Sequence, residues 1–437
     1  MKNISVGMIG FGTIGTGVVR LLKDNGKLIA DRLGTNIVLK RIADIDIVRS
    51  RGVDVDKDVL TTDANDILND PDIDIVVELM GGYEPARTFI LTAIRQKKHV
   101  VTANKAMLAT HGDEIFKESS RSGVNVGFEA SVGGTIPIIK TLKESLVANR
   151  ILSVAAILNG TSNFILSKMT DEGKAFDEVL KEAQALGFAE ANPVYDVEGI
   201  DAAHKLAILL SLAYGKKVGL NDIYREGITA ISAQDVEFAK ELGYRIKLLA
   251  IAIQRDGEIE ARLHPTMIPF DHLLANVNGN FNAFHIFGDA ADSVFLYGQG
   301  AGMMPTASAV VSDIVDIARD MMKGVAVRVP ARVRDEENIQ EIRLMPFDQI
   351  RTNYYFRFSV VDRPGVLSRI SGILGENDIS IATVIQKRRK QGSAVPIVMT
   401  TYKAREADVR KALDQIDRLD VAMGKTILIR IEDEKLR

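Results

Sequence analysis

The stretch from Gly187 to Lys205, GFAEANPVYDVEGIDAAHK, places several carboxylates ahead of a lysine in an apolar helical sequence. Asp201 fits the first turn of a helix, where negative charge is favoured, and Lys205 follows four residues later on the same face. Desolvation lowers the pKa of an amine, whereas a nearby carboxylate raises it. A lysine that transfers protons needs these two effects to balance, so that its pKa lies near the working pH. The alternative interpretation is an ion pair that only stabilises the helix.

Three more carboxylates, those of Glu190, Asp196 and Glu198, precede this helix. Carboxylates held close together repel one another unless a cation lies among them, and the ammonium group of a substrate is a suitable cation. A metal ion is the rival, but His204 projects away from Lys205 on the helix and lysine is an unusual metal ligand. We therefore predict a site for a small cationic substrate.

The residues GFGTIG near the amino terminus match the G-x-G-x-x-G pattern, after a predicted strand and before a predicted helix. In this context the pattern predicts a loop that binds the pyrophosphate of a dinucleotide through backbone N–H groups, and a tight turn without a ligand is the alternative. Asp44 and Asp46 follow the second strand, where a carboxylate binds ribose hydroxyls and favours NAD. Arg49 and Arg51 could instead bind the 2′-phosphate of NADP.

Two other polar stretches follow predicted strands. Asn104 and Lys105 in VVTANKAMLA lie at the carboxyl edge of the sheet, where Lys105 faces the cofactor crevice or, alternatively, is a solvated loop lysine. The stretch FEASVGGTIPII carries Glu129, Gly133 and Gly134. A glycine-rich backbone there binds an anion through N–H groups or a hard cation through carbonyl oxygens, or it serves as a hinge between domains.

The elements that must position these residues form three segments. Apolar strands alternate with helices up to about residue 109, which indicates a doubly wound α/β domain with a parallel sheet. Longer helices and hairpin-linked strands follow and predict an open antiparallel or mixed sheet, and the last segment has the βαββαβ order of a ferredoxin-like unit. We predict a nucleotide-binding domain at 1–130 completed by a helix at 305–324, a substrate-binding domain at 131–304, a linker at 325–352 and a compact C-terminal domain at 353–432.

Composition limits the class of protein. The chain of 437 residues has 46% hydrophobic and 26% charged residues, which is typical of a globular protein with more than one core. A net charge of -3 with dispersed lysines and arginines disfavours nucleic acid as a partner. The longest apolar run is too short to cross a membrane, and the absence of cysteine excludes disulfides and thiolate sites. We expect a cytoplasmic protein with a small-molecule partner.

Several of these stretches together resemble the homoserine dehydrogenase family. The similar residues run from Ile4 to about Lys323 and include GFGTIGTG, TANKAML, EASVGGTIPI, LNGTSNFIL and ALGFAEANPVYDVEGIDAAHKLAIL. The resemblance implies NAD(P)-dependent interconversion of L-aspartate 4-semialdehyde and L-homoserine, in the biosynthesis of threonine, methionine and isoleucine. It also implies that Lys205 gives a proton to the alkoxide formed by hydride transfer, while Lys105 orients the substrate.

The resemblance assigns the remaining site residues. It implies that the substrate contacts Gly187, Glu190, Asp196 and Asp201, and that Asp201 also takes part in catalysis. The cofactor is expected to contact Lys105 and residues at the ends of the first two strands, namely Gly10, Phe11, Gly12, Thr13, Ile14, Gly15 and Asp44. A monovalent cation, Na+ or K+, is expected on the backbone oxygens of Glu129, Val132, Gly134 and Ile136. Many relatives carry a basic residue where this chain has the acidic turn from Asp44 to Asp46, so the sequence favours NAD over NADP.

The final segment, with VVDRPGVLSRISGILGENDISI, resembles an ACT domain, a small-molecule sensing module that often binds amino acids. The resemblance implies that 353–432 is a regulatory domain, that 131–304 also serves dimerisation, and that copies of the chain form a homodimer or homotetramer. It also implies that an end product of the pathway, threonine first, binds at the paired modules and inhibits the protein. The expected effector contacts are Asp362, Gly365, Val366, Leu367, Asn377 and Ile379. A dimerisation module that binds nothing is the alternative, since one fold serves many roles.

Overall fold

The computed structural model describes residues 3–215, 218–331, 343–386 and 395–432. These residues divide into two compact units, each assembled from distant parts of the chain. The first unit comprises 1–150, 203–222 and 296–341, and the second comprises 151–202, 223–295 and 342–437. Across the described ranges, no helix combines the length and the apolar character that a membrane span requires.

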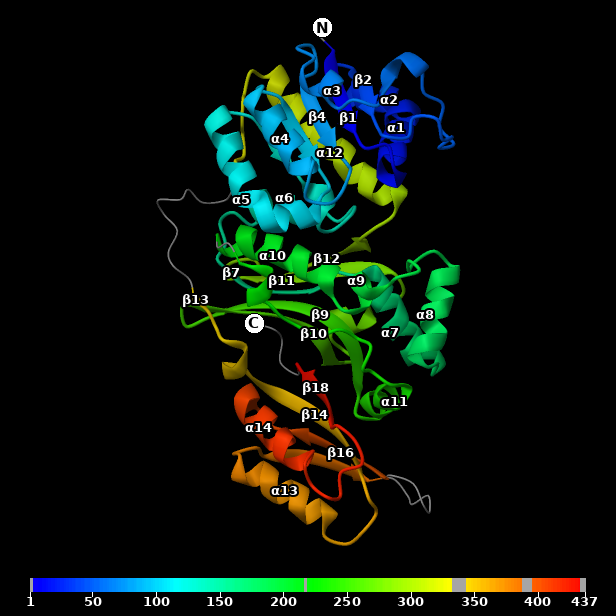
Figure 1. Cartoon of the computed structure of the whole chain (residues 1–437). Helices are drawn as coiled ribbons and strands as arrows, with labels where there is room; N and C mark the ends of the chain where they lie inside the picture. Colours follow the sequence, from blue (N-terminus) through cyan, green and yellow to red (C-terminus); the bar gives the residue numbers. More distant parts are fainter. Residues whose placement is uncertain (1–2, 216–217, 332–342, 387–394, 433–437) are drawn as a thin grey trace. The chain divides into compact units, whose positions relative to one another are not determined.

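The first unit is built on a six-stranded sheet with the order β3-β2-β1-β4-β5-β6, in which all neighbours are parallel. Figure 1 labels β1, β2 and β4 of this sheet. Its strands are β1 (Ile4–Ile9), β2 (Ile37–Ala43), β3 (Leu60–Thr61), β4 (Ile75–Glu78), β5 (His99–Thr102) and β6 (Val126–Gly127). The strand order changes direction at β1, and open α/β sheets bind ligands at the carboxyl ends of the strands beside such a point. The predicted doubly wound α/β arrangement is confirmed.

Helices cover both faces of this sheet. One group consists of α1 (Thr13–Asp24), α2 (Gly26–Leu33) and α12 (Met303–Met322), and the other consists of α3 (Asn65–Leu68), α4 (Ala86–Arg95) and α5 (Lys105–Ser122). Alternate residues of a strand point to opposite faces. Accordingly, Val6 and Met8 of β1 lie in the core with α1 and α12, whereas Gly7 faces Ile67 of α3.

Helix α12 completes the first unit although it follows most of the second unit in the sequence. Its residues Ala307, Val310 and Ile314 lie in one core with β1 and α1. The helix begins at Met303, two residues before the predicted start at Pro305, because proline is tolerated in a first turn whose N–H groups have no helical acceptor. The unit also contains most of α10 (Ile200–Tyr214), together with η1 (Lys57–Val59), η2 (Glu129–Ser131), α6 (Ile138–Lys140), η3 (Thr141–Ser145) and η4 (Leu220–Asp222).

The second unit is organised on a mixed sheet with the order β12-β11-β7-β9-β10-β18-β14-β16-β15, with β8 and β13 added on β10 and β17 on β14. The antiparallel hairpin of β9 (Tyr244–Arg255) and β10 (Glu258–Pro269) forms its centre, as predicted for a mixed sheet. The other strands are β7 (Ile151–Ile157), β8 (Tyr224–Arg225), β11 (Phe281–Gly288), β12 (Asp292–Gln299), β13 (Arg343–Leu344), β14 (Arg351–Val360), β15 (Ile381–Gln386), β16 (Val395–Thr401), β17 (Ala404–Arg405) and β18 (Ile427–Ile431). The helices outside the C-terminal part are α7 (Gly160–Glu172), α8 (Phe176–Ala185), α9 (Val194–Val197), α11 (Ala233–Glu241) and η5 (Leu273–Asn276).

The C-terminal part of the second unit has the order β14, α13 (Val366–Glu376), β15, β16, α14 (Glu406–Ile416) and β18, with the short β17 before α14. This is the predicted βαββαβ module, and α13 and α14 pack on its sheet over a core that contains Phe356, Ile370 and Val409 (Figure 1). Strand β18 also pairs in parallel with β10, with Arg430 opposite Thr266. The module therefore shares one continuous sheet with the rest of the second unit.

Residues 343–352, which we predicted as the end of a linker, contribute to this unit. They form β13, which pairs with β10, the short helix η7 (Phe347–Gln349) and the start of β14. The ring of Phe347 stacks on the ring of Tyr224, with centroids 3.4 Å apart and planes 7° apart. A local pattern could not reveal this order, because the aromatic partner lies far away in the sequence.

A side chain at Gly17 of α1 should push α12 out of the core of the first unit. A Cβ at Gly17 would lie 2.8 Å from the carbonyl oxygen of Met303 and 2.9 Å from the Cβ of Ala307. We expect Gly17→Val to lower the free energy of unfolding by about 1–3 kcal/mol, as overpacking does, measured by urea unfolding. Gly26→Ala is the control, because a Cβ there meets no atom within 4 Å. An equal loss in both variants would contradict the packing argument.

Candidate active site

The glycine loop after β1 has the geometry that a pyrophosphate needs. Gly10 has a φ of +103°, a Cβ there would lie 2.7 Å from the backbone of Leu79, and a Cβ on Gly15 would collide with the carbonyl oxygen of Gly10. A Cβ on Gly12 would project into open space, and no side chain caps the start of α1. The N–H groups of the first turn, which begins at Thr13, have no helical acceptor and can bind an anion. Ile14 belongs to the same turn.

Asp44 holds this loop from the end of β2. Its carboxylate accepts a hydrogen bond of 2.6 Å from the N–H of Phe11 and pairs with Arg51 at 3.2 Å. The guanidinium of Arg51 lies 4.6 Å over the ring of Phe11 and donates to the carbonyl oxygens of Phe11 and Asp46. Within the described ranges, the carboxylate of Asp46 accepts hydrogen bonds only from the N–H groups of Val48 and Arg49, in its own turn. A carboxylate and a guanidinium thus lie side by side where an adenosine ribose binds in this fold.

Lys105 begins α5 at the carboxyl end of β5 and is half-buried. The preceding Asn104 caps the helix through its side-chain oxygen. The backbone N–H of Asn104 donates to the hydroxyl of Thr102, which in turn donates to the buried carboxylate of Glu78 at 2.6 Å. Glu78 was absent from the predicted site, although its place at the end of a strand beside β1 was an available signal.

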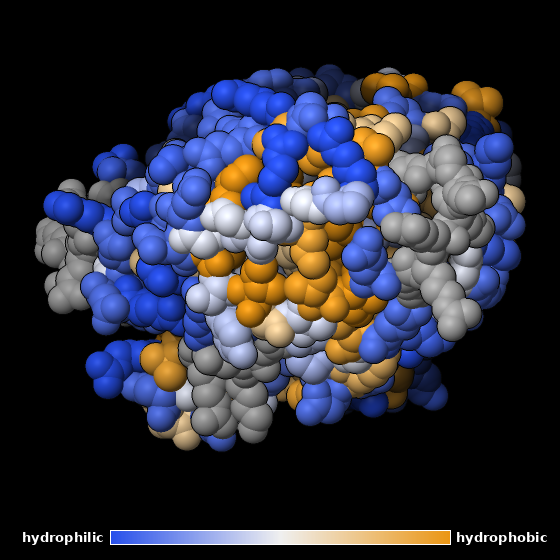
Figure 2. All heavy atoms as spheres, turned by 90° about the horizontal axis from the view of Figure 1, so that it is seen from below, coloured by the Kyte–Doolittle hydropathy of each residue, from blue (hydrophilic) through white to orange (hydrophobic). Residues whose placement is uncertain are grey.

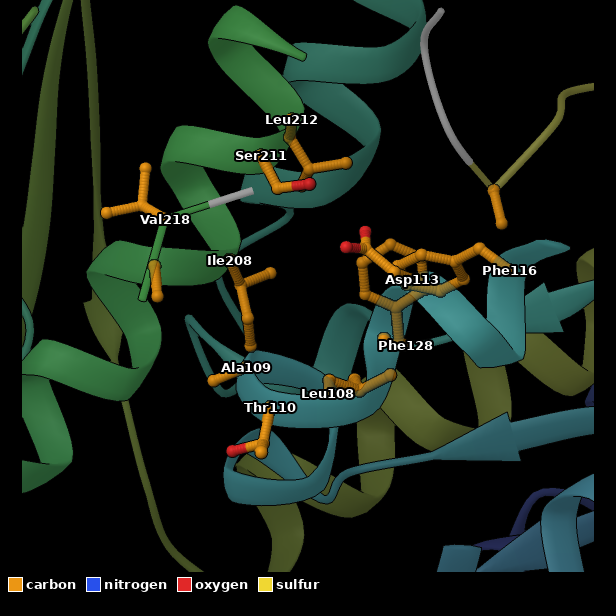
Figure 3. Close-up of a pocket in the computed structure, with 13 residues that line it drawn as sticks. Leu108, Ala109, Thr110, Asp113, Phe116, Phe128, Ile208, Ser211, Leu212 and Val218 are labelled. Atoms are coloured by element: carbon orange, nitrogen blue, oxygen red, sulfur yellow. The ribbon is translucent and has the colours of Figure 1, made fainter. Parts of the chain in front are cut away.

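Lys205 lies in the second turn of α10 and is 6% exposed, while Asp201 in the first turn is 3% exposed. A pocket within the first unit lies between α10 and α5 (Figure 3). Two of its lining residues lie one helical turn after the predicted lysines. Leu108 follows Lys105 on α5, and Ile208 follows Lys205 on α10. The helical segments that carry Lys105 and Lys205 are therefore neighbours in the first unit.

The second unit gathers two of the predicted carboxylates on one amide group. The Nδ2 of Asn159 donates to Asp196 at 2.7 Å and to Asp201 at 3.0 Å. The Oδ1 of Asn159 accepts from the N–H of Ser162, so the same side chain caps α7. Asn159 was not among the predicted site residues, although it stands in the stretch LNGTSNFIL and before a predicted helix.

Glu190 and Gly187 lie on the loop after α8. Gly187 has a φ of +75°, and both residues are exposed. The amide of Gln184 donates to the carbonyl oxygen of Glu190 at 3.1 Å, which anchors the loop through its backbone. The structure thus joins Asp196 and Asp201 through one amide and places Glu190 and Gly187 at the surface.

The predicted cation loop is buried and sharply turned. Glu129, Val132, Gly134 and Ile136 are all buried. Gly134 has a φ of +58°, and a Cβ there would lie 2.5 Å from a neighbouring backbone carbon, so the turn requires glycine. Within the described ranges, no hydrogen bond ends on the carbonyl oxygen of Val132 or Gly134, whereas that of Ile136 accepts from Ile138 at 2.8 Å. Buried carbonyl oxygens without donors fit a hard monovalent cation.

Side chains offer no alternative metal site in the part of the chain that the structure describes. No group of three or more histidines and carboxylates there has an arrangement that could hold a metal ion.

Asp313 of α12 holds the cation loop from outside. Its carboxylate fills the space beside Gly127 and accepts the N–H of Glu129 at 2.8 Å. The carboxylate of Glu129 accepts the N–H groups of Ile139 and Lys140 at 2.7 and 2.9 Å, and the ammonium of Lys140 lies 3.6 Å from Asp313. Burial and the charge of Asp313 raise the pKa of Glu129 to about 7. Burial raises the pKa of Asp313 to about 6.

A pocket of the C-terminal module contains four of the six predicted effector residues, together with residues of β15 and β16. The four are Asp362, Gly365, Val366 and Leu367. The other two lie at the far end of α13, where the amide of Asn377 donates to the carbonyl oxygen of Ile373 at 2.8 Å and Ile379 is buried. Within one chain, therefore, Asn377 and Ile379 do not line this pocket.

Three family models match the chain. The model described as homoserine dehydrogenase matches residues 137–315, and the model described as homoserine dehydrogenase, NAD binding domain, matches residues 10–129. A model described as ACT domain matches residues 354–421. The matches therefore cover most of both compact units.

Relatives match over nearly the whole length. The homoserine dehydrogenase of Pseudomonas aeruginosa is 44% identical over 435 residues, which are 99% of each chain. The crystal structure of a homoserine dehydrogenase from Thiobacillus denitrificans has a TM-score of 0.92 at 47% identity and covers 99% of both chains. A hyperthermophilic archaeal homoserine dehydrogenase mutant in complex with NADPH has a TM-score of 0.61 at 26% identity, over 74% of this chain and 98% of that chain.

The pair of Glu129 and Asp313 should make the protein less stable as the pH rises from about 4 to about 7. Because both pKa values are raised in the folded protein, the folded state binds more protons than the unfolded state over this range. The free energy of unfolding therefore falls with rising pH. Asp313→Asn removes one of these groups and the charge that raises the pKa of Glu129, so we expect the fall to shrink by about 1–3 kcal/mol.

Urea unfolding at a series of pH values measures this change. Asp31→Asn, at an exposed carboxylate on α2, is the control and should leave the pH dependence as in the wild type. An unchanged dependence in Asp313→Asn would contradict the assignment of raised pKa values to this pair.

Proposed function

The chain belongs to the homoserine dehydrogenase family of oxidoreductases, and on this premise we propose that it interconverts L-aspartate 4-semialdehyde and L-homoserine with Lys205 as the proton-transfer group. The observation that carries the proposal is the position of the buried Lys205, one helical turn after the buried Asp201. The side-chain amide of Asn159 donates hydrogen bonds to the carboxylates of both Asp201 and Asp196. Carboxylates near a buried amine suit an amino-acid substrate that is reduced at its other end.

The carboxylates bind the amino group of the substrate. Asp196 and Asp201 form the fixed part of this site, because Asn159 holds both, and Glu190 contributes from the exposed loop. Gly187 allows the turn of that loop through its positive φ. Opposite charges attract strongly where water is excluded, and the attraction orients the substrate for reaction.

Lys205 and Lys105 act on the oxygen at the other end of the substrate. When bound, the nicotinamide supplies or accepts the hydride at the carbon that carries this oxygen. Lys205 gives a proton to the aldehyde oxygen as it becomes an alkoxide and takes the proton back in the reverse direction. The low exposure of Lys205 limits competing proton exchange with water. Lys105, at the N-terminus of α5, stabilises the same developing negative charge.

We propose NAD as the preferred cofactor, bound along Gly10–Gly15. The carboxylate of Asp44 at the end of β2 suits ribose hydroxyls and repels a 2′-phosphate. Arg51 forms an ion pair with Asp44 and lies over the ring of Phe11. The negative charge of Asp44 therefore partly neutralises the positive charge that Arg51 would offer to a 2′-phosphate. An archaeal relative has been solved in complex with NADPH. Release of Arg51 from Asp44 gives this chain a route to use NADP as well.

A monovalent cation, Na+ or K+, is proposed on the backbone oxygens of Glu129, Val132, Gly134 and Ile136. The buried, donor-free carbonyl oxygens of Val132 and Gly134 support this assignment. The cation would stabilise the turn by satisfying carbonyl groups that otherwise stay buried without a partner. Its role in the proposal is structural.

The ACT domain is proposed to regulate the enzyme by binding threonine, an end product of the pathway from homoserine to threonine, methionine and isoleucine. The pocket beside the start of α13 supports this role, because Asp362 offers a carboxylate beside the turn at Gly365. The proposed boundaries are a cofactor domain (1–130 with 305–324), a substrate domain (131–304) and a regulatory domain at 353–432. Of the predicted linker at 325–352, residues 343–352 belong instead to the folded second unit.

Copies of the chain are proposed to associate as a homodimer or homotetramer through the ACT domain. Strand β15 lies at the edge of the sheet, and its Val384 is 42% exposed. Leu367 on α13 is 40% exposed. Seen from the end of the second unit that carries α13, apolar residues gather in a patch with hydrophilic residues around it (Figure 2). An exposed edge strand and apolar side chains favour pairing with a second copy.

Replacing Lys205 tests the mechanism. We expect Lys205→Ala to lower kcat by about 10²–10⁴-fold, the usual contribution of a general acid, with little change in the KM for the cofactor. The assay follows absorbance of the reduced nicotinamide after mixing L-homoserine with NAD or NADP, which also reports cofactor preference. Lys240→Ala, at an exposed lysine of α11, is the control. Normal turnover in Lys205→Ala would remove the central claim.

Threonine should lower the rate of the wild-type enzyme, and Asp362→Asn should weaken this response. We expect the threonine concentration for half-inhibition to rise roughly tenfold, because an amino group loses its charged partner. Asp378→Asn is the matched control, since Asp378 lies beyond the other end of α13 and asparagine tolerates its φ of +56°. Equal responses in the two variants would argue against the pocket beside Gly365.

A further inference from the structure

The guanidinium of Arg430, on β18, joins the ACT domain to the rest of the second unit. The residue is fully buried. It forms two hydrogen bonds with Glu406 of α14, at 2.9 Å from Nε and 2.6 Å from Nη2. Its Nη1 donates to Glu226 at 3.0 Å, in the segment after β8 and outside the ACT domain. Although burial alone raises the pKa of Glu406, the guanidinium of Arg430 lowers this pKa below its usual range.

Tyr224 of β8 belongs to the same cluster as Arg430, Glu406 and Glu226. Its hydroxyl donates to Glu226 at 2.9 Å and accepts a hydrogen bond from Arg410 of α14 at 2.8 Å. Its ring stacks on Phe347, and the guanidinium of Arg430 lies 5.0 Å over it. Planar stacking and forked hydrogen bonds fix a guanidinium in one orientation, so Glu226 has a defined position.

The residues after Glu226 support the loop that carries the substrate carboxylates. A Cβ on Gly227 would lie 2.5 Å from the carbonyl oxygen of Val197 and 2.8 Å from the Cα of Glu198. The N–H of Ile228 donates to the carbonyl oxygen of Val197 at 2.9 Å, and the hydroxyl of Thr229 donates to Glu198 at 3.0 Å. Val197 directly follows Asp196, and Asp201 comes four residues later. The segment 226–229 is therefore the immediate support of this loop.

We propose that Arg430 of the ACT domain is a positioning residue for the substrate, acting through Glu226 on the loop that carries Asp196 and Asp201. The inference rests on the proposed function, because that function assigns the loop to the amino group of the substrate. Arg430 itself touches no substrate in this proposal. A displacement of a binding group by a fraction of an ångström weakens binding strongly. The ACT domain is thus a structural part of the substrate site.

The test compares two ion pairs that both connect the ACT domain to the rest of the second unit. Glu226→Gln keeps the shape of the side chain and removes the charge bound by Arg430, while Arg430→Lys keeps the charge and loses the forked contact. Arg357→Gln is the matched control, because Arg357 of β14 binds Asp235 of α11 at 2.6 Å without contacting the substrate loop.

We expect Glu226→Gln to raise the KM for L-homoserine about 5- to 50-fold and to leave the KM for NAD within about twofold. Arg430→Lys should show a smaller change in the same direction, and Arg357→Gln should show none. Hydrogen exchange of peptides covering 194–199 gives a second measurement that needs no activity. Exchange there should be faster in Glu226→Gln than in the wild type and in Arg357→Gln.

The outcomes separate this inference from the proposed function. If the wild type oxidises homoserine but Glu226→Gln has an unchanged KM, the positioning role is wrong and the function stands. An equal rise in KM in Arg357→Gln would also overturn the role, because any loosening of the ACT domain would then suffice. If the wild type does not oxidise homoserine, the proposed function is wrong, and the exchange of 194–199 alone decides whether Arg430 supports the loop.

Discussion

A single amide group, that of Asn159, donates to both of the carboxylates that we propose for the substrate site. Asp196 and Asp201 repel one another, and Asp201 is 3% exposed, so their approach must be stabilised by donors. Asn159 supplies a donor to each and is itself fixed as the cap of α7, at the end of β7. The position of the site therefore depends on where one strand ends and one helix begins.

Strand β7 belongs to the same sheet as the ACT domain, through β9, β10 and β18. Hydrogen bonds between neighbouring strands therefore join the ACT domain to β7 through the backbone. The buried cluster around Arg430 adds a second connection, which leads through Glu226 to the acidic loop. Two routes thus run from β18 toward the carboxylates, one through the backbone of the sheet and one through side chains.

Contiguous patterns predicted much of the molecule from the sequence. The parallel sheet, the glycine loop, the βαββαβ module and the family could be recognised because their signals lie within short stretches of chain. The partners of the site residues could not, since they are distant in sequence: Asn159 lies 42 residues from Asp201, and Asp313 lies 184 residues from Glu129. Such pairs depend on strand order and register, which no local pattern contains. Arg430 and Glu226 are 204 residues apart.

The place of α12 in the chain has a consequence for synthesis on the ribosome. The first unit ends its amino-terminal segment at residue 150, yet the helix that fills its core begins at Met303. A ribosome adding 5–20 residues per second needs roughly 8 to 30 seconds to translate the intervening stretch. During this interval the core cluster that contains Val6 and Met8 lacks the residues that α12 contributes to it in the finished protein. The nascent chain therefore passes through a long-lived state with an open apolar face, in which self-association competes with folding.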